Sequence, residues 1–205
     1  MTFFLEVIGT IAFAFAGALV AIDNDFDWFG ILCMAVMTAC GGGMTRDIIL
    51  GNTPPMMFRN PVYVSMAVIT GLLTVLIYHR FIQSKHKNRI LDIVNILDAI
   101  GLAIFTIVGM DLAMQLGHTK SFLVCAMGVL TAVGGGLLRD IMVNIKPLIL
   151  TREIYATAAM AGSVIYYYCM LIMPTPIAAS IALIVIFGLR MWTIIKHINL
   201  PVVEK

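Results

Sequence analysis

The sequence predicts an all-α membrane protein in which seven transmembrane helices form a 3+3 inverted repeat plus one C-terminal helix. Two observations favour this fold class, an apolar composition and an internal duplication. The 205 residues are 61% hydrophobic and only 12% charged, and the mean hydropathy is +1.01. Because ordinary globular domains have about 25% charged residues, most of this chain is predicted to lie in lipid.

Seven apolar segments supply the predicted helices, since a hydrocarbon core of about 30 Å requires roughly 20 apolar residues in a helix. The polar or proline-containing breaks between these segments are too short to hold a soluble domain. We therefore expect a single transmembrane domain over residues 1–205. The segments run approximately over residues 3–22, 28–50, 60–79, 93–114, 119–142, 153–173 and 176–194.

The distribution of lysine and arginine predicts the orientation, because cytoplasmic loops are enriched in both. The first segment lacks the basic region of a signal peptide, so it should remain in the mature protein. With the N-terminus outside and the C-terminus in the cytoplasm, three basic residues, Arg46, Arg59 and Lys120, lie outside and ten lie on the cytoplasmic side. The ten are Arg80, Lys85, Lys87, Arg89, Arg139, Lys146, Arg152, Arg190, Lys196 and Lys205.

An internal duplication divides the chain into two similar units. The motif "GGGMTRD" at residues 41–47 recurs as "GGGLLRD" at residues 134–140, an offset of 93 residues. Thr38 and Thr131, Pro54 and Pro147, and Arg59 and Arg152 share this offset, and Glu6 aligns with Asp98 after a slip of one residue. The units cover residues 1–80 and 92–173 approximately, and an extra helix follows at about 176–194. Because each unit holds three spans, the second should insert upside down relative to the first.

The two glycine motifs, the duplication and the seven apolar segments resemble the trimeric intracellular cation (TRIC) channel family and its bacterial relatives over nearly the whole chain. The resemblance implies a homotrimer in the lipid of a bacterial inner membrane, with one pore in each subunit. It implies that kinked second and fifth helices line this pore and that monovalent cations, potassium above all, pass through it. Some bacterial relatives are described as glycine transporters, which leaves a second function open.

The glycine triplets are expected to weaken their helices, because each glycine in a helix interior costs about 1 kcal/mol relative to alanine. A helix that opens there frees carbonyl groups, which must face protein or water rather than lipid. Two such bends near one axis would form a weak cage for a cation. The alternative is that the glycines only permit close helix packing. The pore and kink residues of this hypothesis are Gly41, Gly42, Gly43, Gly134, Gly135, Gly136, Thr38 and Thr131.

An arginine and an aspartate follow each triplet, and charges inside a span are expensive enough to suggest a functional site. Adjacent residues on a helix point about 100° apart, so we expect pairing across the two repeats rather than between neighbours. A positive charge in the path would oppose cations, which favours a bracing or gating role over ion binding. Alternatively, the arginines snorkel to the headgroups. The charged candidates are Arg46, Asp47, Arg139, Asp140, Glu6 and Asp98.

Other residues are assigned to packing or to the membrane interface. The cysteines Cys33, Cys40, Cys125 and Cys169 lie in apolar segments without CxxC spacing, which favours packing over a redox or metal site. The aromatic residues Trp28, Trp192, Tyr63 and Tyr155 are predicted to lie at the lipid–water interface. The net charge of +2 and one basic loop fit a membrane surface, and neither nucleic acid nor a soluble protein partner is expected.

Passive conduction of monovalent cations is the function these features favour. The alternative is a secondary transporter for glycine or another small zwitterion, in which half-helix N-termini and Arg46 or Arg139 hold the carboxylate. The sequence contains no nucleophile elbow, phosphate loop or metal-ligand spacing, so an enzyme is not expected. We expect no cofactor and no bound metal other than K⁺ or Na⁺ in transit.

Overall fold

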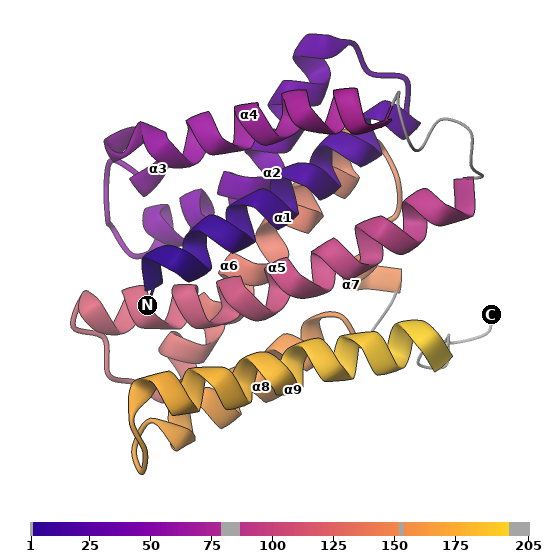
Figure 1. Ribbon diagram of the computed structural model, residues 1–205. Coiled ribbons are helices and arrows are strands. Elements are labelled where there is room, and N and C mark those ends of the chain that lie inside the picture. The colour runs from indigo at the N-terminus through magenta and orange to yellow at the C-terminus, as the bar shows by residue number, and fades with distance from the viewer. Residues whose placement is uncertain (1, 79–86, 152–153, 197–205) are drawn as a thin grey trace, which may run out of the picture.

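The computed structural model describes residues 2–78, 87–151 and 154–196, and in these ranges the chain forms α-helices joined by short turns (Figure 1). The predicted all-α fold class is thereby confirmed. The helices are α1 (Thr2–Asp23), α2 (Trp28–Ile49), α3 (Met56–Arg59), α4 (Pro61–Ile77), α5 (Lys87–Gln115), α6 (Ser121–Met142), α7 (Leu148–Thr151), α8 (Ala156–Cys169) and α9 (Thr175–Lys196).

Each apolar segment predicted from the sequence overlaps one of the longer helices. Five of them, α1, α2, α5, α6 and α9, are long and apolar enough to cross a membrane. The α4 and α8 helices are shorter, with 17 and 14 residues. The prediction missed two short helices, α3 and α7, which lie directly after the motif helices. It also began α5 too late, because residues 87–92 continue the helix despite their charges.

The two motif helices end in the same way. Leu50 caps α2 and is followed by Gly51 with φ +67°, and Val143 caps α6 and is followed by Asn144 with φ +55°. Glycine and asparagine are the residues that most readily adopt this left-handed conformation at a helix C-terminus. In both places a backbone N–H one residue later returns to the helix, from Asn52 to Asp47 O (2.8 Å) and from Ile145 to Asp140 O (3.0 Å). These turns send the chain back toward the motif aspartates.

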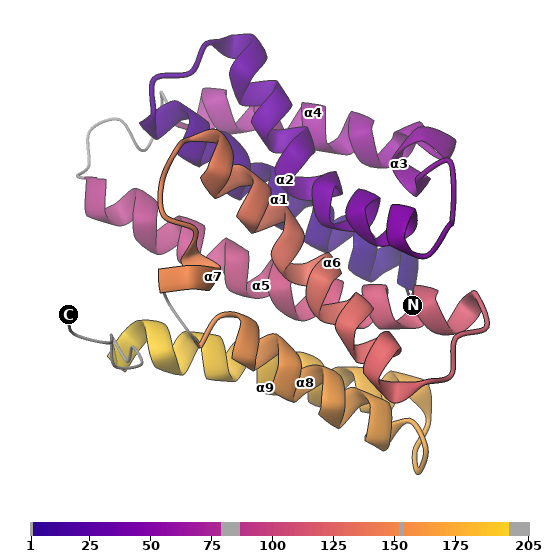
Figure 2. The same ribbon diagram turned by 180° about the vertical axis from the view of Figure 1, so that it is seen from behind.

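The centre of the bundle is a crossing of four helices. The α1 and α5 helices pack against each other, α2 packs on α1, α6 packs on α5, and α2 contacts α6. Phe13 and Phe105 meet at this centre with ring centroids 5.2 Å apart. The α4 helix covers α1 and α2, and α8 and α9 cover α5 and α6. In both views α3 and α7 lie at opposite ends of the bundle (Figures 1 and 2).

The four aromatic residues predicted at the interface fall into two classes. Trp28 and Trp192 are more than half exposed on the outside of the bundle, where apolar side chains would meet lipid. Tyr63 and Tyr155 are instead buried, with 8% and 1% exposure. Their prediction as interface residues was wrong, because each hydroxyl turns inward to a polar site.

Candidate functional site

The glycine motifs meet where α2 crosses α6. A Cβ atom on Gly42 would collide with the carbonyl oxygen of Thr131, and one on Gly135 would collide with that of Thr38. A Cβ on Gly134 would lie 2.8 Å from Gly42 Cα. The two backbones therefore touch, and only glycine permits this distance at the middle position of each triplet.

The expected opening of the motif helices is not observed. The α2 helix is α-helical from Trp28 to Ile49 and α6 from Ser121 to Met142, so both continue through their glycines. An unbroken helix satisfies its own backbone groups inside the bundle. In this structure the glycines permit close packing, which was the alternative considered from the sequence.

The two candidate threonines also lie at helix crossings. Both are buried, and the Thr131 hydroxyl donates to Met127 O at 2.6 Å. A Cβ on Gly109 of α5 would lie 2.5 Å from Thr131 Oγ1, and Gly17 of α1 approaches Thr38 in the same manner. Each threonine thus packs against a glycine of a neighbouring central helix.

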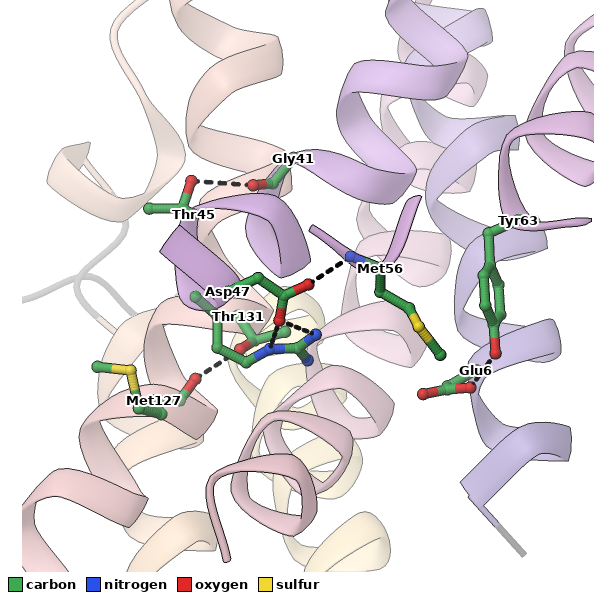
Figure 3. Close-up of polar contacts among 9 residues, drawn as sticks. Glu6, Gly41, Thr45, Asp47, Met56, Tyr63, Met127 and Thr131 are labelled. Atoms are coloured by element: carbon green, nitrogen blue, oxygen red, sulfur yellow. Dashed lines mark hydrogen bonds and ion pairs between the residues drawn. The ribbon is translucent and has the colours of Figure 1, made fainter. Parts of the chain in front are cut away.

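The first half-site consists of Glu6, Arg46, Asp47 and Tyr63. The Arg46 guanidinium donates to Asp47 Oδ1 through Nε (3.0 Å) and Nη2 (2.8 Å). The other carboxylate oxygen of Asp47 accepts from the Met56 N–H of α3 at 2.8 Å. Separately, the Tyr63 hydroxyl of α4 donates to Glu6 of α1, a half-buried carboxylate (Figure 3). Glu6 therefore has a neutral partner and Asp47 a charged one.

A cavity of about 60 Å³ opens beside the first half-site. It is lined by helices α1 to α6, and its polar lining includes Glu6, Arg46, Asp47, Tyr63 and Thr131. A single water requires about 10–15 Å³ of such a cavity, so the cavity can hold a dehydrated monovalent cation with a few waters. With both carboxylates ionised, its formal charge is −1.

The second half-site consists of Asp98, Arg139, Asp140 and Tyr155, all at most 1% exposed. Arg139 donates to Asp140 Oδ1 through Nε (2.9 Å) and to Asp98 Oδ1 through Nη1 (2.8 Å). Asp140 Oδ2 accepts from the Leu148 N–H of α7 at 2.8 Å. The guanidinium carbon of Arg190 in α9 lies 4.8 Å from the centre of the Tyr155 ring.

The ion pairs differ from the pairing expected between repeats. Each motif arginine bonds to the aspartate that follows it, because the long guanidinium side chain can bend back to its neighbour even though the Cα–Cβ bonds diverge. Asp98 does pair with an arginine, but with Arg139 of its own repeat. Glu6 pairs with Tyr63, also in its own repeat. Arginine snorkelling is excluded for Arg46 and Arg139, which are 5% and 1% exposed.

Sequence reasoning missed three residues of these sites, Tyr63, Tyr155 and Arg190. Tyr63 and Tyr155 are 92 positions apart, the same offset as Glu6 and Asp98, and this shared spacing could have identified them. Arg190 was counted as a cytoplasmic charge near a span end, but it is 2% exposed inside the bundle. The duplication gave no signal for it, because α9 has no counterpart in the repeats. Its position inside the predicted segment 176–194 was a signal, since a charge within a span suggests a functional site.

The charge count used for orientation changes once the buried arginines are removed. Arg46, Arg139 and Arg190 make internal contacts and do not report on loops. Eight basic residues then remain on the side predicted to be cytoplasmic and two, Arg59 and Lys120, on the other. Of the eight, Arg80, Lys85, Arg152 and Lys205 lie outside the described residues.

Comparison with known proteins places this chain among membrane proteins. A family model described as a glycine transporter matches it twice, over residues 3–79 and 95–171. The inner membrane protein YadS of Escherichia coli is 34% identical over 98% of this chain and 95% of its own length. The family model thus recognises both units of the chain and leaves α9 outside the matches.

Solved structures of high similarity are TRIC channels rather than enzymes. The trimeric intracellular cation channel orthologue from Rhodobacter sphaeroides superposes with a TM-score of 0.88 at 32% identity, covering 96% of this chain and 98% of that one. A prokaryotic TRIC channel crystallised in 0.5 M KCl gives 0.88 at 33% identity, covering 97% and 98%.

Proposed function

Because this chain belongs to the family described as glycine transporters and has the fold of TRIC cation channels, we propose that it conducts monovalent cations, potassium above all, through a pore in each subunit of a homotrimer. The family membership confirms the resemblance drawn from the two glycine motifs. The TRIC likeness also agrees with the expectation that the protein is not an enzyme. No resident cofactor enters the proposal, and K⁺ or Na⁺ would occupy the pore only in transit.

One observation carries this proposal, the negatively charged cavity between α2 and its neighbours. The Glu6 carboxylate lines the cavity and is hydrogen-bonded to a neutral tyrosine, so its charge stays available to a cation. Arg46 is drawn to Asp47, which offsets its repulsion of cations. Carboxylates at a pore favour cations over anions. Thr131 brings α6 into the lining, in support of a path along the second and fifth spans.

We further propose that the membrane domain of residues 1–205 has seven spans built as a 3+3 inverted repeat with α9 as the extra helix. Asp47 and Asp140 accept corresponding backbone hydrogen bonds, from Met56 and from Leu148, and the family model matches the chain in two segments. Both observations support the repeat. The opposite placement of α3 and α7 supports its inversion (Figures 1 and 2). The first half-site would then face one side of the membrane and the second the other.

The orientation of this domain, with the N-terminus outside and the C-terminus in the cytoplasm of a bacterial inner membrane, rests on the remaining basic residues. Two exposed lysines provide matched reporters, Lys120 before α6 and Lys146 after it. In a variant without native cysteines, Lys120→Cys should react with impermeant thiol reagents added to intact cells. Lys146→Cys should react only after the membrane is opened, and the reverse pattern would invert the topology.

A specific observation favours glycine transport as the second candidate function. The same cavity contains a guanidinium, Arg46, and a carboxylate, Glu6, which are the groups that bind the two ends of a small zwitterion. The description of the matched family points the same way. Both candidates use the first half-site, so one set of variants can distinguish them.

The deciding experiment measures K⁺ current and glycine uptake on the same purified protein. In a planar bilayer under a KCl gradient, a channel gives unitary current steps with a reversal potential near that of K⁺, which a transporter cycling on the μs to ms scale or slower cannot produce. Glu6→Gln should lower K⁺ conductance about fivefold, the effect of about 1 kcal/mol from one charge in a hydrated cavity. Saturable glycine uptake that requires Arg46, without unitary currents, would refute the channel and establish the transporter.

A further inference from the structure

The α9 helix contributes a buried positive charge to the second half-site. It packs along α5 and α8 at the edge of the bundle (Figure 1). Its Arg190 is 2% exposed and lies over the Tyr155 ring. Both segments matched by the family model exclude α9, so this charge comes from a part of the chain that the repeats do not share.

Arg190 holds a ring whose hydroxyl occupies the counterpart of the first cavity. A Cβ on Gly136 would lie 3.0 Å from the Tyr155 hydroxyl and 3.5 Å from Asp98 Oδ1. The corresponding Cβ on Gly43 would meet only Arg46 Nη2, at 3.6 Å, among the described residues, and Gly43 lines the cavity. Each tyrosine hydroxyl thus lies by the carboxylate of its own repeat, Glu6 or Asp98, but Tyr63 borders an open space, whereas the Tyr155 hydroxyl lies against Gly136 where the corresponding space would be. A cation over an aromatic face fixes the ring, since the attraction requires the cation within about 6 Å of its centre.

Arg190 also changes the charge of the second half-site. The carboxylates of Asp98 and Asp140 with Arg139 alone would have a formal charge of −1, as the first half-site has. The guanidinium of Arg190, 4.8 Å from the centre of the Tyr155 ring, adds a positive charge beside these groups, which opposes the entry of a cation.

We propose that Arg190 is a positioning residue that holds Tyr155 over Gly136 and thereby keeps the second half-site closed while the first is open. This inference rests on the proposed conduction path, of which it names the gate. Release of Tyr155 from Arg190 opens a second cavity beside the Asp98 carboxylate at the opposite end of the bundle, and the two cavities then form the path for a cation.

Two matched positions report whether each half-site is open. Cys40 lines the first cavity, and Val133, 93 positions later, is its buried counterpart on α6. In a background without the other cysteines, a small cationic methanethiosulfonate should modify Cys40 in the otherwise native protein. A cysteine placed at Val133, with Cys40→Val, should react slowly.

Arg190→Gln should accelerate modification at position 133 by about 10- to 30-fold, the shift expected when a desolvated cation–π contact is lost. Arg190→Lys retains the positive charge and should restore the slow rate, which a purely steric role of the side chain would not produce. Tyr155→Phe removes the hydroxyl but keeps the ring, and it should also accelerate the reaction.

An unchanged rate at position 133 in both Arg190→Gln and Tyr155→Phe would overturn the inference. Equal acceleration at Cys40 and at position 133 would also overturn it, because it would indicate general loosening of the fold. If Arg190→Gln cannot be purified as a folded protein, the Tyr155→Phe comparison decides. Labelling requires no ion flux, so an absence of K⁺ current would refute the channel separately from the role of Arg190.

Discussion

The two half-sites contain corresponding residues but differ in burial and charge. In the first, Arg46 has one carboxylate partner, Glu6 has a tyrosine, and both Arg46 and Glu6 line a cavity. In the second, Arg139 has two carboxylate partners and the tyrosine lies under a further arginine. A duplicated motif therefore yields one site beside a cavity and one fully buried site, because elements outside the motif decide which groups surround it.

The largest expected difference between the half-sites concerns stability. Asp98→Asn leaves the Arg139 charge buried with only one carboxylate, which should cost about 3–5 kcal/mol of unfolding free energy. Glu6→Gln changes a half-buried group hydrogen-bonded to a neutral hydroxyl and should cost about 1 kcal/mol or less. Thermal unfolding of both variants in one detergent measures the difference. Equal losses would contradict the distinction between a fully buried site and a site beside a cavity.

The glycine crossing predicts a second, intermediate difference, here between neighbouring positions of one motif. Gly42→Ala places a methyl group against the Thr131 carbonyl and should cost about 1–3 kcal/mol, because the helices must separate. Gly43→Ala has room and should be neutral or stabilising by up to about 1 kcal/mol through helix propensity. If chemical denaturation shows that Gly43→Ala is the more damaging variant, close packing is not the role of the triplet.

The smallest expected effect is on conduction at the first half-site. Arg46→Gln removes the positive charge from the cavity, while Asp47 keeps its bond from the Met56 N–H. Single-channel K⁺ conductance should rise about fivefold at low salt, from roughly 1 kcal/mol of removed repulsion. Since salt screens charges in a hydrated cavity, the increase should shrink in concentrated KCl. A fall in conductance, or an increase independent of salt, would mean that Arg46 supports the path rather than opposing the cation.

Much of the fold could be predicted from the sequence, because lipid imposes simple rules on composition. Apolar segments of sufficient length must be helical, so the segment boundaries agree with the longer helices to within a few residues at most ends. The spacing of the motifs also identified Asp98 as a candidate, and it does pair with an arginine. The short α3 and α7 helices were missed because four-residue helices have no periodicity to detect.

What the sequence by itself determined is therefore an all-α membrane fold and a duplicated motif with its charged candidates. The tertiary structure decided which charges pair, that the glycines pack rather than open their helices, and that the two half-sites differ. Spacing along a chain reports only its own helix, whereas the partner of a buried charge is whichever side chain another helix brings to it. Arg190 illustrates the reason: its place inside the last apolar segment marks it as an unusual charge, but only the packing of α9 places it over Tyr155.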